Sequence, residues 1–112
     1  MTEKVNSVLK QFIEDISNLL GDRLKKVILY GSYARGNYDK NSDLDIMILT
    51  DLNEQELAEN RIKIRDIACD LEMENDISIS PLVRNIEKYN DRINIVPFYM
   101  NVQKEGVVLR GR

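Results

Sequence analysis

The sequence predicts a single α/β domain, and three observations lead to that prediction. Apolar residues recur at three- and four-residue steps from Val5 to Leu20 and again over 54–74, as in helices that bury one side. Short apolar runs, bounded by turn residues, alternate with these helical segments as strands do in α/β proteins. The chain has 112 residues, about the length of one domain, and no linker or repeat divides it. We therefore expect one domain over residues 1–112.

The elements can be placed in chain order from these patterns. They are a helix ending at Gly21, a strand at 26–30, a polar loop at 31–42, a strand at 44–50, a helix at 54–74, a strand at 76–83, a polar helical segment at 84–92 and a last helix near Pro97. Asn53 and Glu56 have the spacing of a capping box. Pro81 lacks an N–H and predicts that the third strand lies at an edge. Phe98, Tyr99 and Met100 are expected in the core, and residues 107–109 in a small final strand.

Composition excludes several classes of function. The net charge of -3 disfavours nonspecific binding to a nucleic-acid backbone, so no nucleic-acid partner is expected. No run of about 20 apolar residues could span a membrane, and the N-terminus lacks a signal-peptide pattern. The single cysteine, Cys69, cannot form an internal disulfide and is expected to be buried, which agrees with a cytoplasmic protein. The absence of histidine excludes histidine-based triads and zinc sites.

Two aspartates in the second strand indicate a functional site. Side chains alternate along a strand, so Leu44, Ile46 and Ile48 face the core, and Asp43 and Asp45 share the other face about 7 Å apart. Like charges at that spacing add no stability to a strand. If the third strand lies beside the second, Asp76 can join them. Three carboxylates suit Mg²⁺, which prefers oxygen ligands, and two such ions can hold the reacting oxygens of a phosphoryl transfer.

The Gly31-Ser32 step at the end of the first strand predicts a phosphate-binding turn. Gly31 permits close backbone approach, and Ser32 is placed to cap a short helix, whose free N–H groups would attract phosphate. Arg35 could contact a phosphate or pair with an acid. Ser42 could orient the carboxylates or end the loop. Tyr30, Tyr33 and Tyr38 flank this region and are expected to pack, half buried, more than to stack on a base.

A spacing of ten residues separates Gly31-Ser32 from Asp43-Leu44-Asp45. This pattern resembles the signature of the nucleotidyltransferase superfamily that includes DNA polymerase beta. The longer stretch GSYARGNYDKNSDLDIMIL looks like that of the minimal nucleotidyltransferases. The resemblance implies a polymerase beta-like palm fold, a mixed β-sheet flanked by helices. It also implies Mg²⁺-dependent transfer of a nucleoside monophosphate from a nucleoside triphosphate to a hydroxyl. Gly31 and Ser32 would then hold phosphates, Asp43 and Asp45 would bind two Mg²⁺ ions, and Asp76 would be the third carboxylate.

The resemblance also implies a partner. Minimal members are commonly encoded with a HEPN-family toxin and resemble its antitoxin, and some transfer AMP from ATP to a tyrosine of that toxin. Larger relatives carry extra domains that hold the acceptor, and this chain has none. Two alternatives remain open. One is a noncatalytic antitoxin that inhibits a HEPN partner by binding, and the other is an enzyme that modifies a small molecule such as an antibiotic.

Overall fold

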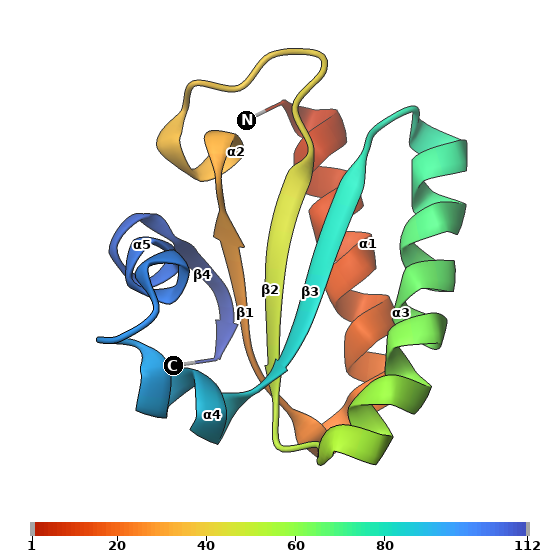
Figure 1. Cartoon of the computed structure of the whole chain (residues 1–112). Helices are drawn as coiled ribbons and strands as arrows, with labels where there is room; N and C mark the ends of the chain where they lie inside the picture. Colours follow the sequence, from red (N-terminus) through yellow and green to blue (C-terminus); the bar gives the residue numbers. More distant parts are fainter. Residues whose placement is uncertain (1, 112) are drawn as a thin grey trace.

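The structure is a computed structural model that describes residues 2–111. A four-stranded sheet is flanked by helices, with the long helices α1 and α3 on one side and the shorter α4 and α5 on the other (Figure 1). The element order is α1 (Glu3–Leu20), the 3₁₀ turn η1 (Gly21–Arg23), β1 (Leu24–Tyr30), α2 (Ser32–Arg35), β2 (Leu44–Thr50), α3 (Glu54–Asn75), β3 (Ile79–Asn85), α4 (Ile86–Arg92), α5 (Pro97–Glu105) and β4 (Val107–Gly111). No helix within residues 2–111 is long and apolar enough to cross a membrane.

The sheet is mixed, as the sequence predicts. Its strand order is β3-β2-β1-β4, with β1 antiparallel to both β2 and β4, and β2 parallel to β3. A parallel pair needs a long crossover connection, and α3 supplies it. Pro81 lies in β3, which is an edge strand, so its missing N–H removes no bond within the sheet.

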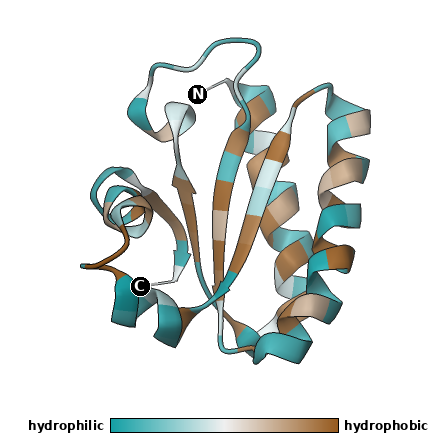
Figure 2. Cartoon of the chain, viewed as in Figure 1, coloured by the Kyte–Doolittle hydropathy of each residue, from teal (hydrophilic) through white to brown (hydrophobic). Residues whose placement is uncertain are grey.

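The sheet is covered on both faces, which explains why β2 is apolar along most of its length (Figure 2). Leu44, Ile46 and Ile48 pack against α1 and α3, as their alternation predicts. Met47 and Leu49 are buried on the opposite face, with Tyr89 of α4 and Val102 of α5. Asp45 is the one residue of β2 that is not buried. Because the rest of β2 is buried, the partly exposed acid makes this end of the strand the candidate functional position.

Three sequence-based expectations about the elements are corrected. The third strand begins at Ile79 instead of residue 76, because α3 continues to Asn75 and Asp76 serves as its C-cap in a left-handed conformation (φ 51°). Cys69 is exposed, since it follows the buried Ala68 onto the outer side of α3. Phe98 and Met100 are exposed, by 41% and 46%, so the expected core cluster reduces to the half-buried Tyr99.

The predicted capping box at the start of α3 is present and is joined to η1 by an ion pair. The Asn53 side chain accepts from the Glu56 N–H, and the Glu56 carboxylate accepts from the Asn53 N–H. Arg23 of η1 also donates to both carboxylate oxygens of Glu56, at 2.8 and 2.9 Å. These hydrogen bonds, that to Arg23 first, lower the pKa of Glu56 to about 2.

Replacing Glu56 with Gln is therefore expected to lower the melting temperature at neutral pH. A depressed folded-state pKa stabilises the protein above the unfolded pKa near 4.5, and this contribution is lost as the pH falls toward 2. The melting curves of parent and variant should therefore converge over that range. Thermal melts by circular dichroism between pH 7 and pH 2 measure it. The control is Glu59→Gln, at a surface acid that forms no ion pair within residues 2–111 and accepts one hydrogen bond, from Gln55. A difference that does not change with pH would contradict the proposed cause.

Candidate functional site

The candidate site lies where β1 and β2 end together. Antiparallel pairing sets Tyr30, the last residue of β1, opposite Asp45. Gly31 then turns the chain into α2 with φ 76°, a conformation that only glycine adopts easily. A Cβ on Gly31 would lie 2.2 Å from Asp45 Oδ2, too close for any side chain. The structure thus holds the backbone of the Gly31-Ser32 step directly against the Asp45 carboxylate.

A cavity of about 410 Å³ opens at this point. Its lining residues come from β1, α2, β2 and α5, and are Tyr30, Gly31, Ser32, Arg35, Asp45, Phe98, Asn101, Val102 and Glu105. This volume lies within the range of small-molecule sites, about 300–1,000 Å³. Four of the predicted site residues, Gly31, Ser32, Arg35 and Asp45, therefore share one pocket, with room beside them for a ligand.

The carboxylates in this region repel each other. Burial raises the pKa of Asp45, and the charge of Asp43 raises it further, while the charge of Arg35 acts in the opposite direction. Burial, and then the charge of Asp45, raises the pKa of Tyr30 to about 12, so that phenol stays protonated at neutral pH. Negative charge is therefore concentrated and only partly compensated at Asp43 and Asp45, which is the condition that a bound cation relieves.

Three of the predicted residues are held in ways that refine their expected roles. Ser32 is the first residue of α2 and Gly31 is the cap, so the prediction of a Ser32 cap is wrong by one position. Arg35 pairs with Glu105 of α5 at 3.3 Å, and both side chains are partly exposed at the cavity. Ser42 accepts a hydrogen bond from the Asp39 N–H at 2.9 Å, which favours its reading as a loop residue.

Asp76 is not brought together with Asp43 and Asp45. It lines a different cavity, with Lys40, Asn41, Glu72, Ile77 and Ser78. Within residues 2–111 no group of three acidic, histidine or cysteine side chains could hold a metal ion. The expected three-carboxylate cluster fails because the register of β2 and β3 pairs Asp45 with Ser80, and Asp76 precedes the strand altogether. Asp43 and Asp45 are therefore left as the candidate metal ligands, and Glu105, which also lines the cavity, is paired with Arg35.

Residues 9–105 match the nucleotidyltransferase domain family. The chain belongs to this family of enzymes. A relative from Methanocaldococcus jannaschii, named "Putative protein adenylyltransferase MJ0141", is 42% identical over 80 residues that cover 71% of this chain and 79% of the relative. A second from the same organism, "Putative protein adenylyltransferase MJ0604", is 35% identical over 101 residues, covering 90% and 93%.

Solved structures resemble this nucleotidyltransferase in fold. A crystal structure described as "a putative nucleotidyltransferase from Sulfolobus solfataricus" has a TM-score of 0.64 at 20% identity, covering 97% of this chain and 84% of that one. A crystal structure of "the toxin-antitoxin with AMP-PNP" has a TM-score of 0.55 at 21% identity, covering 91% and 73%. At such low identity these likenesses support the mixed sheet flanked by helices, which is the fold predicted from the sequence.

The part of the nucleotidyltransferase cavity that sequence reasoning missed comes from α5. Phe98, Asn101 and Glu105 line it, although Phe98 is expected from the sequence to be in the core. Phe98 also meets Tyr30 edge to face, with ring centroids 5.5 Å apart. The signal was their spacing of three and four residues, which places an aromatic, an amide and an acid on one side of a helix. As expected, Tyr33 packs, stacked on Tyr38 with centroids 4.3 Å apart.

Proposed function

We propose that this nucleotidyltransferase transfers AMP from ATP to a tyrosine hydroxyl of a HEPN-family toxin in the cytoplasm and acts as its antitoxin. The observation that carries the proposal is the contact geometry of Gly31 and Asp45, which joins a turn able to bind phosphate to a carboxylate within one cavity. The names of the two archaeal relatives favour a protein as the acceptor. The likeness to a toxin–antitoxin structure with AMP-PNP agrees with ATP and with a toxin partner.

The residues at the cavity suit this reaction. The triphosphate would lie on the backbone at Gly31 and Ser32, with Arg35 within reach of its negative charge. The acceptor oxygen forms a bond to the α-phosphorus, the bond from that phosphorus to the bridging oxygen breaks, and pyrophosphate leaves. The acceptor proton passes to water, because Asp76, the carboxylate expected to accept it, lines a different cavity. Holding the reactants in line supplies much of the catalysis in phosphoryl transfer.

Asp43 and Asp45 fit the Mg²⁺ that the family implies. Mg²⁺ usually binds through one or two carboxylates and completes its shell with water and substrate phosphates, and Asp43 and Asp45 would supply these two carboxylates. The raised pKa of Asp45 shows that its negative charge is poorly compensated in the protein alone. When bound, Mg²⁺ supplies positive charge that offsets the triphosphate. The binding of two Mg²⁺ ions stays a prediction, and Asp43 and Asp45 would be their ligands.

The test is transfer of radiolabel from [α-³²P]ATP to a co-purified HEPN partner in the presence of Mg²⁺. Label on a tyrosine of the partner, lost in Asp43→Asn, is the expected result. A toxin that is inhibited but carries no label would contradict catalysis and favour the noncatalytic antitoxin. Label on an added aminoglycoside, with none on protein, would favour the small-molecule enzyme.

When ATP binds, Arg35 is expected to leave its ion pair with Glu105 and to contact the triphosphate instead. Arg35→Gln should weaken ATP binding about tenfold, as expected for one hydrogen bond to a charged group. Glu105→Gln should leave ATP binding unchanged or slightly tighter, because it releases the guanidinium. Isothermal titration with a nonhydrolysable ATP analogue and Mg²⁺ measures both. Equal weakening in the two variants would mean that the ion pair only supports the fold.

A further inference from the structure

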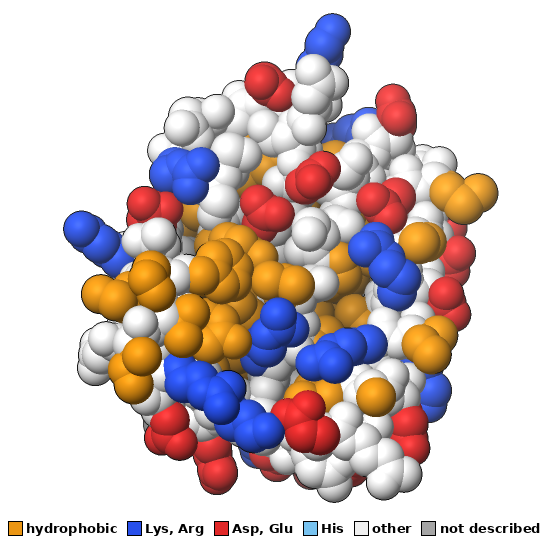
Figure 3. Space-filling view, viewed as in Figure 1, with side chains coloured by type: hydrophobic (Ala, Val, Ile, Leu, Met, Phe, Trp, Pro, Cys, Tyr) orange, Lys and Arg blue, Asp and Glu red, His pale blue; other side chains and the backbone are white. Residues whose placement is uncertain are grey.

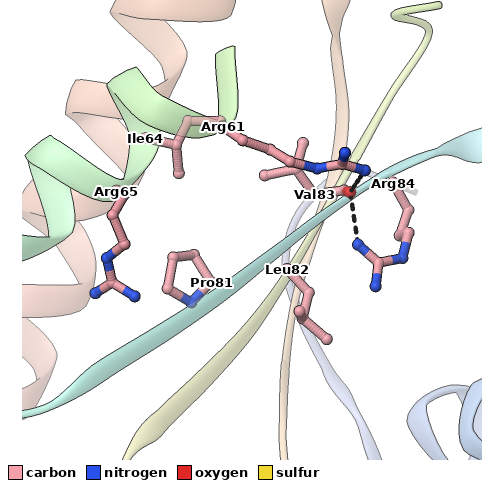
Figure 4. A pocket seen from close by; sticks show the side chains of 7 residues that line it. All are labelled: Arg61, Ile64, Arg65, Pro81, Leu82, Val83 and Arg84. Carbon is pink, nitrogen blue, oxygen red and sulfur yellow. Dashed lines mark hydrogen bonds between the residues drawn. The ribbon is translucent and has the colours of Figure 1, made fainter. Parts of the chain in front are cut away.

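A third cavity, of about 250 Å³, lies between α3 and the edge strand β3 (Figure 4). We call it the arginine cleft, and its lining residues are Arg61, Ile64, Arg65, Pro81, Leu82, Val83 and Arg84. Lysine and arginine side chains gather on the face of the molecule seen in Figure 3, beside an apolar patch and below a group of acids. This arrangement is unexpected in a chain whose net charge is -3.

The backbone of β3 holds the three arginines in place. Arg61 Nη2 and Arg84 Nη1 donate to the same oxygen, that of Val83, at 3.4 and 2.9 Å (Figure 4). Arg65 Nη2 donates to the oxygen of Ile79 at 3.1 Å and also pairs with Glu72 at 3.0 Å. The Ile79 N–H donates to Glu72, and Pro81 has no N–H. These contacts occupy much of the outer edge of β3, so the cleft is poorly suited to an added strand.

Two of the guanidinium groups lack a carboxylate partner. Among residues 2–111, neither Arg61 nor Arg84 forms an ion pair, and the nearby Glu54 contacts Lys88 instead, at 2.5 Å. A guanidinium carries five N–H donors, so several remain on each side chain after its bond to Val83. Two like charges that converge on one oxygen without a counter-ion favour an anion between them. The planar fork of arginine matches a carboxylate with two parallel hydrogen bonds.

The arginine cleft extends toward the candidate active site. Pro81 pairs with Ile46 and Arg84 pairs with Leu49, so the cleft runs along β3 and its Pro81 end is level with Ile46, the residue after Asp45. Alternation places Arg84 on the same face of the sheet as Asp45. Their levels differ by four residues, about 13 Å along the strands. A bound segment that extends four residues past Arg84 could therefore present a side chain to Asp45.

We propose that the arginine cleft docks an acidic segment of the protein that receives the nucleotide. The inference rests on the proposed function in requiring a protein acceptor. The cavity volume is below the range of about 300–1,000 Å³ typical of small-molecule sites, and suits one or two side chains. An extended nucleic acid would need a longer basic stripe than these arginines provide. An acidic peptide matches both the positive charge and the size.

A binding experiment without chemistry tests the cleft by itself. The probe is a fluorescein-labelled peptide, Glu-Asp-Glu-Tyr-Glu-Asp, and anisotropy gives its Kd for the parent and for Arg61→Gln/Arg84→Gln. We expect at least about tenfold weakening in this double variant, since charge-assisted hydrogen bonds are lost. The matched control, Lys10→Gln/Lys63→Gln, removes the same charge from exposed positions outside the cleft and should change Kd less than twofold. Circular dichroism verifies that both variants fold.

Several outcomes would overturn the proposal. One is that the parent does not bind the peptide, and another is that the control variant weakens peptide binding equally. A third is that the parent binds a labelled oligothymidylate more tightly than the peptide and that only the arginine variant loses this binding, which would indicate a nucleic-acid site. With the peptide as acceptor, the arginine variant should raise KM with kcat unchanged, whereas Asp43→Asn should lower kcat. Peptide binding that depends on the arginines, without transfer by the parent, would support the cleft and count against the proposed function. Transfer to the peptide by the parent, with the same KM in the arginine variant, would support the proposed function and count against the cleft.

Discussion

Asp45→Asn is expected to reduce nucleotide transfer by at least about 10²–10³-fold, the size of effect seen when one charge-stabilising group is removed from an active site. Asn keeps the shape of the side chain but removes the charge that a metal ion would neutralise. Asp45 lines the cavity and lies against the Gly31 turn, whereas Glu105, which also lines the cavity, pairs with Arg35. Steady-state transfer with labelled ATP and Mg²⁺ measures the loss.

The same substitution is expected to make the metal-free protein more stable. Burial and Asp43 raise the pKa of Asp45, so the charged form is disfavoured in the folded state. This penalty is present at neutral pH, shrinks as the pH falls through the raised folded pKa, and is gone below the unfolded value of 3.8. In EDTA, the variant should therefore melt at a higher temperature than the parent at pH 7, and the difference should narrow toward pH 4.

Asp22→Asn is the matched control for Asp45→Asn. Asp22 is exposed in η1, at the opposite end of β1 from the site, so this change removes the same charge without touching the cavity. It should preserve transfer and leave the melting temperature nearly unchanged. Adding Mg²⁺ with a nonhydrolysable ATP analogue should raise the melting temperature of the parent and of Asp22→Asn, but not of Asp45→Asn. Normal transfer by Asp45→Asn would refute the assigned role.

The half of the site formed by β1, the Gly31 turn and β2 could be predicted because its signals are local. Alternation places Leu44 and Asp45 on opposite faces, and glycine marks the turn. The position of Asp76 could not be predicted, since it depends on where α3 ends and on how the crossover sets the register of β3. One extra residue of helix moves Asp76 from a strand into a left-handed cap, and Ser80 then takes the place beside Asp45.

Two other features also depend on tertiary structure and could not be predicted from local patterns. They are the contribution of α5 to the cavity and the arginine cleft. The run Phe98-Tyr99-Met100 is apolar, and its composition alone predicts burial. Its exposure depends instead on how α5 packs against β1. Arg61 and Arg65 lie on α3, and their positions in the sequence do not indicate that they meet. They converge with Arg84 only because β3 lies at the sheet edge, where its carbonyl oxygens are open to α3.

Gly31→Ala is expected to abolish transfer and to destabilise the fold. The backbone at Gly31 has φ 76° and ψ -156°, a region used almost only by glycine, so the strain alone costs on the order of 1–3 kcal/mol. The added Cβ would also lie 2.2 Å from Asp45 Oδ2, so either the turn or the carboxylate must move. Transfer assays and chemical denaturation measure the two effects separately.

Gly36→Ala separates backbone strain from the clash with the carboxylate. Gly36, at the end of α2, has φ 83°, yet a Cβ there would meet no atom within 4 Å. It should therefore lose stability through strain, roughly 1–2 kcal/mol, and keep most of its transfer activity. If Gly36→Ala lost activity as completely as Gly31→Ala, the defect would come from α2 as a whole. If only Gly31→Ala is inactive, the close approach of backbone to Asp45 is what the reaction requires.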